Sequence, residues 1–304
     1  MQGQVVYATL RLQTRGLKLF ENFIGDSILL SKIKPRHAEV FIAQRLATVP
    51  SVATVNKDIR TLRRIFNLAI EPREYLVEGQ NPFAKLKERK TTPNEIRYVE
   101  VREYLGLVEK ANGSWWRAFF SLAYGSGLRR NEILNLTWKN VDFEDQLITV
   151  AAKKEVENIL RWDPKSRVNR IIPMSDESSH RLADLQLKAT EGFPYIFISP
   201  ERLNRIRERQ KLGKWNPRSQ IVTNLDRNFK ALGCKAGLDK CVIHDLRRSA
   251  ITNWAKELPI QVVQQLAGHS DISTTRKYYV AVRAEDMISA SKVLNSILTK
   301  TRDD

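Results

Sequence analysis

The sequence contains few of the residues that build metal sites or disulfide frameworks. Its 304 residues include only two cysteines, Cys234 and Cys241, and four histidines, and the two cysteines form no CxxC pair. Structural zinc sites and disulfide-stabilised secreted folds both need denser sets of these residues. We therefore expect no metal or other cofactor, no disulfide framework and a reducing, cytoplasmic compartment.

Long apolar stretches are also missing. Because no run of about 18 apolar residues occurs, the sequence predicts no membrane span. The first residues, MQGQVVYATLRLQ, lack the charged start and the apolar core of a secretory signal. No GxxxxGK[ST] motif is present, so the sequence lacks the phosphate-binding loop of P-loop ATPases.

Positive charge is abundant. Lys and Arg together number 51 against 34 Asp and Glu, which gives a formal net charge of +17. The 42% of hydrophobic residues is ordinary for a globular protein, so the chain is expected to fold. A folded chain with this excess of positive charge typically binds a polyanion, and nucleic acid is the first candidate. The alternative is a basic surface that serves only solubility.

The first part of the chain is predicted to be helical. Apolar residues at helical spacing predict helices over residues 6–23, 35–46 and 51–70. The face of the third helix opposite its apolar stripe carries a set of basic residues, which either is solvated or faces DNA. This set consists of Lys57, Arg60, Arg63 and Arg64.

A charged segment divides the chain. Residues 87–97, KERKTTPNEIR, contain a proline and show no apolar periodicity, which is typical of a linker. A chain of this length also exceeds the size of one typical core. We expect a helical domain at residues 1–88, a linker at 89–97 and a second domain at 98–304.

The second part mixes helices with a few strands. Helices are predicted at 99–111 and 114–124, strands at 146–150, 159–162, 170–174 and 195–198, and mainly helices after 175. The expected fold is mainly α with a small antiparallel β-sheet. Before a helix expected near residue 219 lies a basic segment, which is either a DNA-facing loop or helix or a solvated loop. Its candidate DNA contacts are Arg205, Arg207 and Arg209.

A first motif occupies residues 126–136, SGLRRNEILNL. Gly127 can end the preceding helix, and Arg129 then stands at the start of the next one. Glu132 follows three residues later, on the same helix face. Taken alone, this pattern is typical of a structural ion pair.

A second motif occupies residues 244–249, HDLRRS. His244 and Arg247 are spaced i, i+3, so on a helix they share a face, while Leu246 and Ala250 face the core. An arginine can bind two phosphate oxygens and a histidine can move a proton, so the pair suits a phosphate. A basic surface helix is the alternative.

A third motif occupies residues 266–279, LAGHSDISTTRKYY. Gly268 permits a turn between two helices, and Ser270 or Asp271 can cap the second, which places residues 274–279 on it. Tyr278 follows His269 by nine residues. On a helix the rings of Tyr278 and the next tyrosine point about 100° apart, so only one can face a ligand. A packed aromatic ring is the alternative.

Together the three motifs resemble the signature boxes of the tyrosine recombinase, or phage integrase, family. The resemblance extends over residues 98–285, and residues 1–88 are similar to the family's core-binding domain. It implies an α+β catalytic domain and a catalytic set of Arg129, His244, Arg247, His269 and Tyr278, with the nine-residue spacing selecting Tyr278 over Tyr279. The family's β-hairpin lysine corresponds to Lys165. Because this sequence has extra residues at 151–162, Lys153 and Lys154 are alternatives to Lys165 for this role. Arg248 stands where relatives often have histidine.

The resemblance also implies an activity. Family members cleave and rejoin DNA through a 3′-phosphotyrosine without metal or ATP, as homotetramers on two DNA sites that contain inverted repeats. An amphipathic helix expected at residues 284–298 would dock into a neighbouring subunit or pack on its own domain. A type IB topoisomerase and a catalytically silent DNA-binding relative are the alternatives. The resemblance implies a prokaryotic, phage or mobile-element origin; target sequence and accessory proteins stay open.

Overall fold

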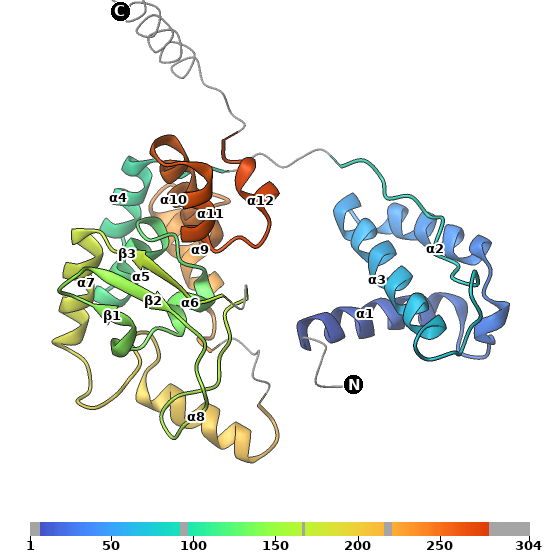
Figure 1. Cartoon of the computed structure of the whole chain (residues 1–304), viewed down its shortest axis with the longest axis horizontal. Helices are drawn as coiled ribbons and strands as arrows, with labels where there is room; N and C mark the ends of the chain where they lie inside the picture. The colour runs from blue at the N-terminus through green and yellow to red at the C-terminus, as the bar shows by residue number, and fades with distance from the viewer. Residues whose placement is uncertain (1–6, 92–96, 166–167, 216–220, 280–304) are drawn as a thin grey trace, which may run out of the picture. The chain divides into compact units, whose positions relative to one another are not determined.

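The structure is a computed structural model that describes residues 7–91, 97–165, 168–215 and 221–279. The chain divides into two compact units, Met1–Glu95 and Ile96–Asp304, which Figure 1 draws in one view. The C-terminal helix expected at residues 284–298 lies outside the described residues. In the part that is described, no helix is both long and apolar enough to cross a bilayer.

The first unit is a small helical bundle around an aromatic core. The ring of Phe20 lies edge-on to the rings of Phe41 and Phe83, with both centroids 5.2 Å away. Its helices follow the predicted ranges closely. They are α1 (Tyr7–Ile24), the 3₁₀ turn η1 (Leu30–Lys32), α2 (Pro35–Thr48) and α3 (Val52–Ile70).

Helices α1 and α3 pack closely because Gly16 has no side chain. A Cβ atom at Gly16 would lie 3.0 Å from Cγ2 of Thr61. The chain then folds back on α3, where the amide of Asn56 donates to the Arg89 carbonyl (2.8 Å) and accepts from its N–H (2.9 Å). Residues up to Arg89 are therefore fixed to the first unit.

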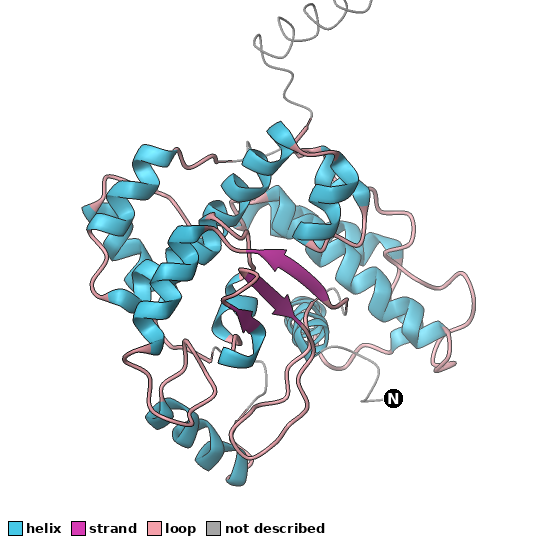
Figure 2. Ribbon diagram, turned by 60° about the vertical axis from the view of Figure 1, so that its left-hand side comes forward, coloured by secondary structure: helices cyan, strands magenta, loops and turns pink. Residues whose placement is uncertain are grey.

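In the second unit, helices pack around an antiparallel three-stranded sheet of order β1-β2-β3, which is magenta in Figure 2. Ile148 of the central strand pairs with Val141 on one side and Ile172 on the other. The buried helix α5 contacts α4, α6, α7 and α10. The elements are α4 (Val101–Glu109), α5 (Ser114–Tyr124), α6 (Arg130–Leu134), η2 (Trp138–Asn140), β1 (Val141–Asp142), β2 (Leu147–Val150), β3 (Arg170–Pro173), α7 (Asp176–Gln186), α8 (Pro200–Lys211), α9 (Leu225–Lys235), α10 (Ile243–Glu257), α11 (Ile260–Ala267) and α12 (Ile272–Arg276).

Three expectations for this unit were wrong. Residues 159–162 and 195–198 form only isolated bridges, such as Lys153 with Trp162, and α9 begins at Leu225 rather than near 219. The physical reason at 159–162 is that Leu160 packs into a separate apolar cluster with Leu203 and Ile206 of α8. The loop therefore lies beside α8, as Figure 1 shows, and does not extend the sheet.

Candidate active site

The C-terminal end of α11 gathers three arginines. The carbonyl groups of three consecutive residues each accept a hydrogen bond from a different guanidinium group. The pairs are Leu266 with Arg170 Nε (3.0 Å), Ala267 with Arg247 Nη2 (2.6 Å) and Gly268 with Arg129 Nη2 (2.9 Å). Carbonyls at a helix C-terminus lack partners within the helix and carry partial negative charge. The first and second motifs thus meet the third at this turn.

Arg129 is fixed by its own helix as well. It precedes α6, and the carboxylate of Glu132, which is 2% exposed, accepts from the Arg129 N–H (2.8 Å) and Nη1 (2.9 Å). The predicted pairing of these two residues is confirmed. The expectation that Gly127 ends the preceding helix was wrong, because Gly125 caps α5. Gly127, at φ +55°, instead gives room to Trp254, whose ring would lie 2.6 Å from a Cβ there.

Arg247 is buried on α10. The predicted helix is confirmed, with Leu246 and Ala250 facing the core. Besides Ala267, the Arg247 guanidinium donates to the Gly127 carbonyl. Burial and the nearby charge of Arg129 lower the pKa of Arg247, but a guanidinium group remains protonated at neutral pH. The site therefore keeps a fixed positive charge beside Arg129.

His269 lies directly against Arg247. Its Nε2 atom is 3.4 Å from Arg247 Nη2, and its Nδ1 atom is 2.9 Å from the hydroxyl of buried Thr275. Because a guanidinium group only donates, we assign Nε2 as the acceptor and place the proton on Nδ1. Desolvation and the charge of Arg247 lower the pKa of His269 to about 4, so the imidazole is neutral at pH 7.

His244 lies in the first turn of α10 with an exposed side chain. Desolvation of the imidazole, followed by the charges of Arg247 and Arg248, lowers the pKa of His244 to about 4. The side chain is therefore neutral at pH 7 and can accept a proton.

The two tyrosines lie in a turn beyond α12. The prediction that the helix continues to residue 279 was wrong, because α12 ends at Arg276. The Tyr279 hydroxyl donates to the Leu258 carbonyl (2.7 Å), which holds this ring against α10. The Tyr278 ring stacks on the His269 ring at 6.3 Å between centroids, and its hydroxyl has no hydrogen-bond partner among the described residues.

Burial raises the pKa of Tyr278, and the charges of Arg247, Arg248 and Arg129 oppose that rise. The Tyr278 hydroxyl is therefore protonated at neutral pH and lies in the field of the site's arginines. The capping residue predicted for α12 is confirmed at Asp271, whose carboxylate accepts from the Ser273 N–H (2.8 Å).

The three candidate lysines differ in their surroundings. Lys165 is exposed in the loop before β3, next to residues 166 and 167, which lie outside the described part. Lys153 turns inward, and its ammonium group donates to the Asn135 carbonyl and to the Thr137 hydroxyl (3.2 Å). Desolvation lowers the pKa of Lys153 to about 7. Lys154 is exposed.

Several predicted DNA contacts have partners within the protein. In the first unit, Arg60 pairs with Glu88, and Arg63 donates to the Phe83 and Leu86 carbonyls. Lys57 and Arg64 are exposed. In α8, Arg205 and Arg209 are exposed, whereas Arg207 is turned onto the preceding loop. It binds Glu155 and the carbonyls of Val156, Glu157 and Ile159.

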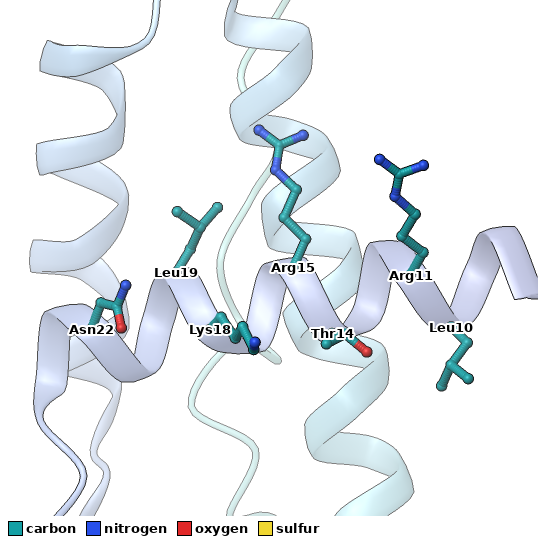
Figure 3. A pocket seen from close by; sticks show the side chains of 7 residues that line it. All are labelled: Leu10, Arg11, Thr14, Arg15, Lys18, Leu19 and Asn22. Carbon is teal, nitrogen blue, oxygen red and sulfur yellow. The ribbon is translucent and has the colours of Figure 1, made fainter. Parts of the chain in front are cut away.

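A basic row on α1 was not predicted from the sequence. Arg11, Arg15 and Lys18 are exposed and line a shallow groove, and Figure 3 shows Arg11 and Arg15 extending side by side. Arg15 also lines a second hollow together with Lys57 of α3. The spacing of i, i+4 and i+7 on a helix was the signal that could have revealed this row.

Comparisons with known proteins identify the family of the chain. The model of the phage integrase family matches residues 95–286. The tyrosine recombinase XerA of Pyrococcus furiosus is 26% identical over 266 residues, which cover 86% of this chain and 82% of that protein. A tyrosine recombinase XerC-like protein of Caldanaerobacter subterraneus subsp. tengcongensis is 25% identical over 314 residues, covering 91% and 76%.

Solved structures share the fold. The Tn1549 transposon integrase in complex with transposon right end DNA superposes with a TM-score of 0.73 at 19% identity, over 97% of this chain and 96% of that one. A lambda integrase tetramer bound to a Holliday junction gives 0.66 at 18% identity, over 90% and 74%. Because the family model matches well over half of the sequence, this chain belongs to the phage integrase family.

Proposed function

We propose that this protein is a site-specific DNA recombinase that cleaves and rejoins DNA through a covalent bond between Tyr278 and a 3′ phosphate. The observation that carries the proposal is the end of α11, where Arg129 and Arg247 are held beside a tyrosine whose hydroxyl has no hydrogen-bond partner among the described residues. Phosphoryl transfer needs a nucleophile and fixed positive charge at the phosphate oxygens, and this group of side chains supplies both.

In this proposal Arg129 and Arg247 bind the two non-bridging oxygens of the scissile phosphate. Both guanidinium groups are already oriented by carbonyl oxygens, so little reorganisation is needed when DNA binds. Each arginine is expected to stabilise the transition state by about 3 kcal/mol, as oxyanion-stabilising donors do. His269, next to Arg247, is expected to hydrogen-bond the same phosphate through Nε2, which requires Nε2 to carry the imidazole proton when DNA is bound.

The proton transfers follow from the bonds that change. The Tyr278 oxygen attacks phosphorus, the bond from phosphorus to the 5′ oxygen breaks, and the tyrosine proton passes to His244. A bound phosphate anion raises the imidazole pKa from its low value in the free chain toward the range useful to a base. Lys165 donates the proton that the leaving 5′ oxygen needs. Rejoining reverses these steps, and the phosphotyrosine bond conserves the energy of the broken one.

Double-stranded DNA with an inverted-repeat site is the proposed substrate. The exposed basic residues of α1 and α3, with Arg205 and Arg209 of α8, are the proposed phosphate contacts. Since lambda integrase forms a tetramer on a Holliday junction, we propose that four copies of this chain act on two DNA sites. Docking of residues 284–298 in a neighbouring subunit remains part of this proposal.

Covalent capture tests the chemistry. The protein is mixed with nicked duplexes of random sequence in EDTA without ATP, the reaction is quenched with detergent, and DNA attached to protein is sequenced. We expect attached DNA to share an inverted repeat and to be lost with Tyr278→Phe. Tyr279→Phe is the matched control and should retain attachment, because its hydroxyl binds the Leu258 carbonyl.

Other outcomes of the capture experiment change the proposal. Attachment without a shared sequence would favour a type IB topoisomerase. A protein that binds DNA but attaches none would be a silent relative, and attachment that survives Tyr278→Phe would assign the nucleophile to another residue.

A further inference from the structure

Arg170 occupies an unusual position for an arginine, on the buried face of a strand. Along β3 the side chains of Arg170 and Ile172 point inward, while those of Ile171 and Pro173 point outward. The Arg170 side chain is only 3% exposed. Burying a guanidinium group is costly unless its charge and its N–H groups are paired. The partners of Arg170 therefore indicate its role.

The first partner is the carboxylate of Glu132. Arg170 Nη1 donates to Oε1 (3.0 Å) and Nη2 donates to Oε2 (2.7 Å), which is the two-pronged geometry that fixes a carboxylate in orientation. The same two oxygens accept the hydrogen bonds from Arg129. Because Glu132 is held from one side by Arg170, it can hold Arg129 from the other.

The second partner is the turn at the end of α11. Arg170 Nε donates to the Leu266 carbonyl, and a Cβ atom on Gly268 would lie 3.0 Å from Arg170 Nη1. The guanidinium group therefore packs against the peptide whose carbonyl accepts from Arg129 Nη2. Both groups that fix Arg129, the Glu132 carboxylate and the Gly268 carbonyl, contact Arg170.

We propose that Arg170 is a positioning residue for phosphoryl transfer, which holds Arg129 in its working orientation through Glu132 and the Gly268 turn without touching DNA. The proposal rests on the proposed function, in which Arg129 neutralises a non-bridging oxygen of the scissile phosphate. All three nitrogens of the Arg170 guanidinium group donate to protein acceptors. It therefore acts through Arg129.

The test compares two substrates that differ at one atom. One carries the normal scissile phosphate in the site recovered by covalent capture, and the other carries a racemic methylphosphonate, which replaces a charged oxygen with a methyl group. Arg170→Met should slow single-turnover cleavage of the phosphate by about 100-fold, as loss of an oxyanion donor does. On the methylphosphonate the wild type and the variant should differ by about threefold or less, because the charge that Arg129 neutralises is gone.

Equal losses on both substrates would overturn the proposal, since a merely structural defect does not depend on the charge of the phosphate. Arg45→Met is the matched control, because Arg45 forms an ion pair of low exposure with Asp58 in the first unit (2.9 Å). It should lower the melting temperature and leave the ratio of the two cleavage rates unchanged.

Two further variants keep the test decisive. Arg170→Lys retains the charge but not the two-pronged contact, and it should show the same selective loss on the phosphate even where Arg170→Met fails to fold. In an Arg129→Lys background, Arg170→Met should slow cleavage of the phosphate only slightly further. Additive losses of the cleavage rate would contradict the proposal. A wild-type chain that attaches to no DNA would refute the proposed function itself, a separate outcome.

Discussion

Two sets of basic residues, one in each unit, are held in opposite ways. In the second unit, Arg129, Arg170 and Arg247 are largely buried and bound to carbonyl or carboxylate oxygens at the end of α11. On α1 of the first unit, Arg11, Arg15 and Lys18 extend from one helix into solvent (Figure 3). One set has lost its conformational freedom during folding, whereas the other retains it.

This difference separates two uses of positive charge. A guanidinium group that folding has already oriented can act on one phosphate with the geometry that a transition state requires. An exposed side chain instead releases counterions when it approaches any phosphate, so it contributes affinity that depends on salt and not on sequence. We therefore expect the buried arginines at the end of α11 to control the cleavage rate and the α1 row to contribute to affinity.

The largest expected effect concerns a group that breaks this comparison. Lys165 is exposed, yet we assign it the proton for the leaving oxygen, whereas Lys153 is tied to the Asn135 carbonyl. Lys165→Ala should slow single-turnover cleavage by about 1000-fold, and Lys153→Met should change it by less than about tenfold. A substrate with a 5′-bridging sulfur, whose leaving group needs no proton, should restore cleavage by Lys165→Ala. Restoration of Lys153→Met instead would reverse the assignment.

Arginine-to-lysine substitutions sharpen the comparison. Arg129→Lys keeps the charge but loses the planar fork that binds Glu132 and Gly268, so cleavage should fall by about 100-fold at saturating DNA. Arg15→Lys on α1 should leave both the cleavage rate and the affinity nearly unchanged. Quenched single-turnover assays measure the cleavage rate, and fluorescence anisotropy measures the affinity for DNA. A similar loss in both variants would show that the α1 row is also geometrically demanding.

Removing the charge of the α1 row should affect binding alone. With Arg11, Arg15 and Lys18 all changed to Gln, the slope of log affinity against log salt should decrease in magnitude by about 2.7, or 0.9 for each phosphate contact. The cleavage rate at saturating DNA should stay as in the wild type. An unchanged slope, measured by titration at several salt concentrations, would remove α1 from the DNA-binding surface.

The smallest expected effect is a loss of stability in mild acid. The pKa of His269 is about 4 in the folded chain against an ordinary value of 6.5, so the unfolded state binds more protons between these values. Stability is therefore lost as pH falls from 6.5 toward 4. Because the His269 ring is partly exposed, its lowered pKa contributes about 1 kcal/mol to the free energy of unfolding. Urea unfolding of His269→Gln should show a shallower decline over this range, and an equal decline would contradict the lowered pKa.

The sequence predicted the helices more accurately than the strands. The range 114–124 was predicted to the residue, because its apolar positions follow a helical period through a buried segment. The expected strand at 159–162 failed because short apolar runs do not reveal what covers them, and Leu160 is covered by α8. The end of α12 before Tyr278 could not be predicted either, since it coincides with a tertiary hydrogen bond from Tyr279.

The site was predictable where a motif carries it. The sequence predicted Arg129, Arg247 and His269 from the three motifs. It did not predict that the two arginines bind the consecutive carbonyls of Gly268 and Ala267, or that His269 lies against Arg247. Arg170 was missed although a signal existed, because strand alternation with Ile172 places it on the buried face. An arginine there needs a charged partner, and nothing in the sequence names Glu132 as that partner.

The carbonyl anchors of Arg247 have an electrical consequence. A carboxylate held against one guanidinium group offsets much of its charge; Glu132 is shared by Arg129 and Arg170, so those three groups together keep a net positive charge. Peptide carbonyls, such as those of Gly127 and Ala267, offer only partial charges. These carbonyl groups fix the orientation of the Arg247 guanidinium group without neutralising its charge. The full attraction of Arg247 is thus reserved for the one anion that enters the site.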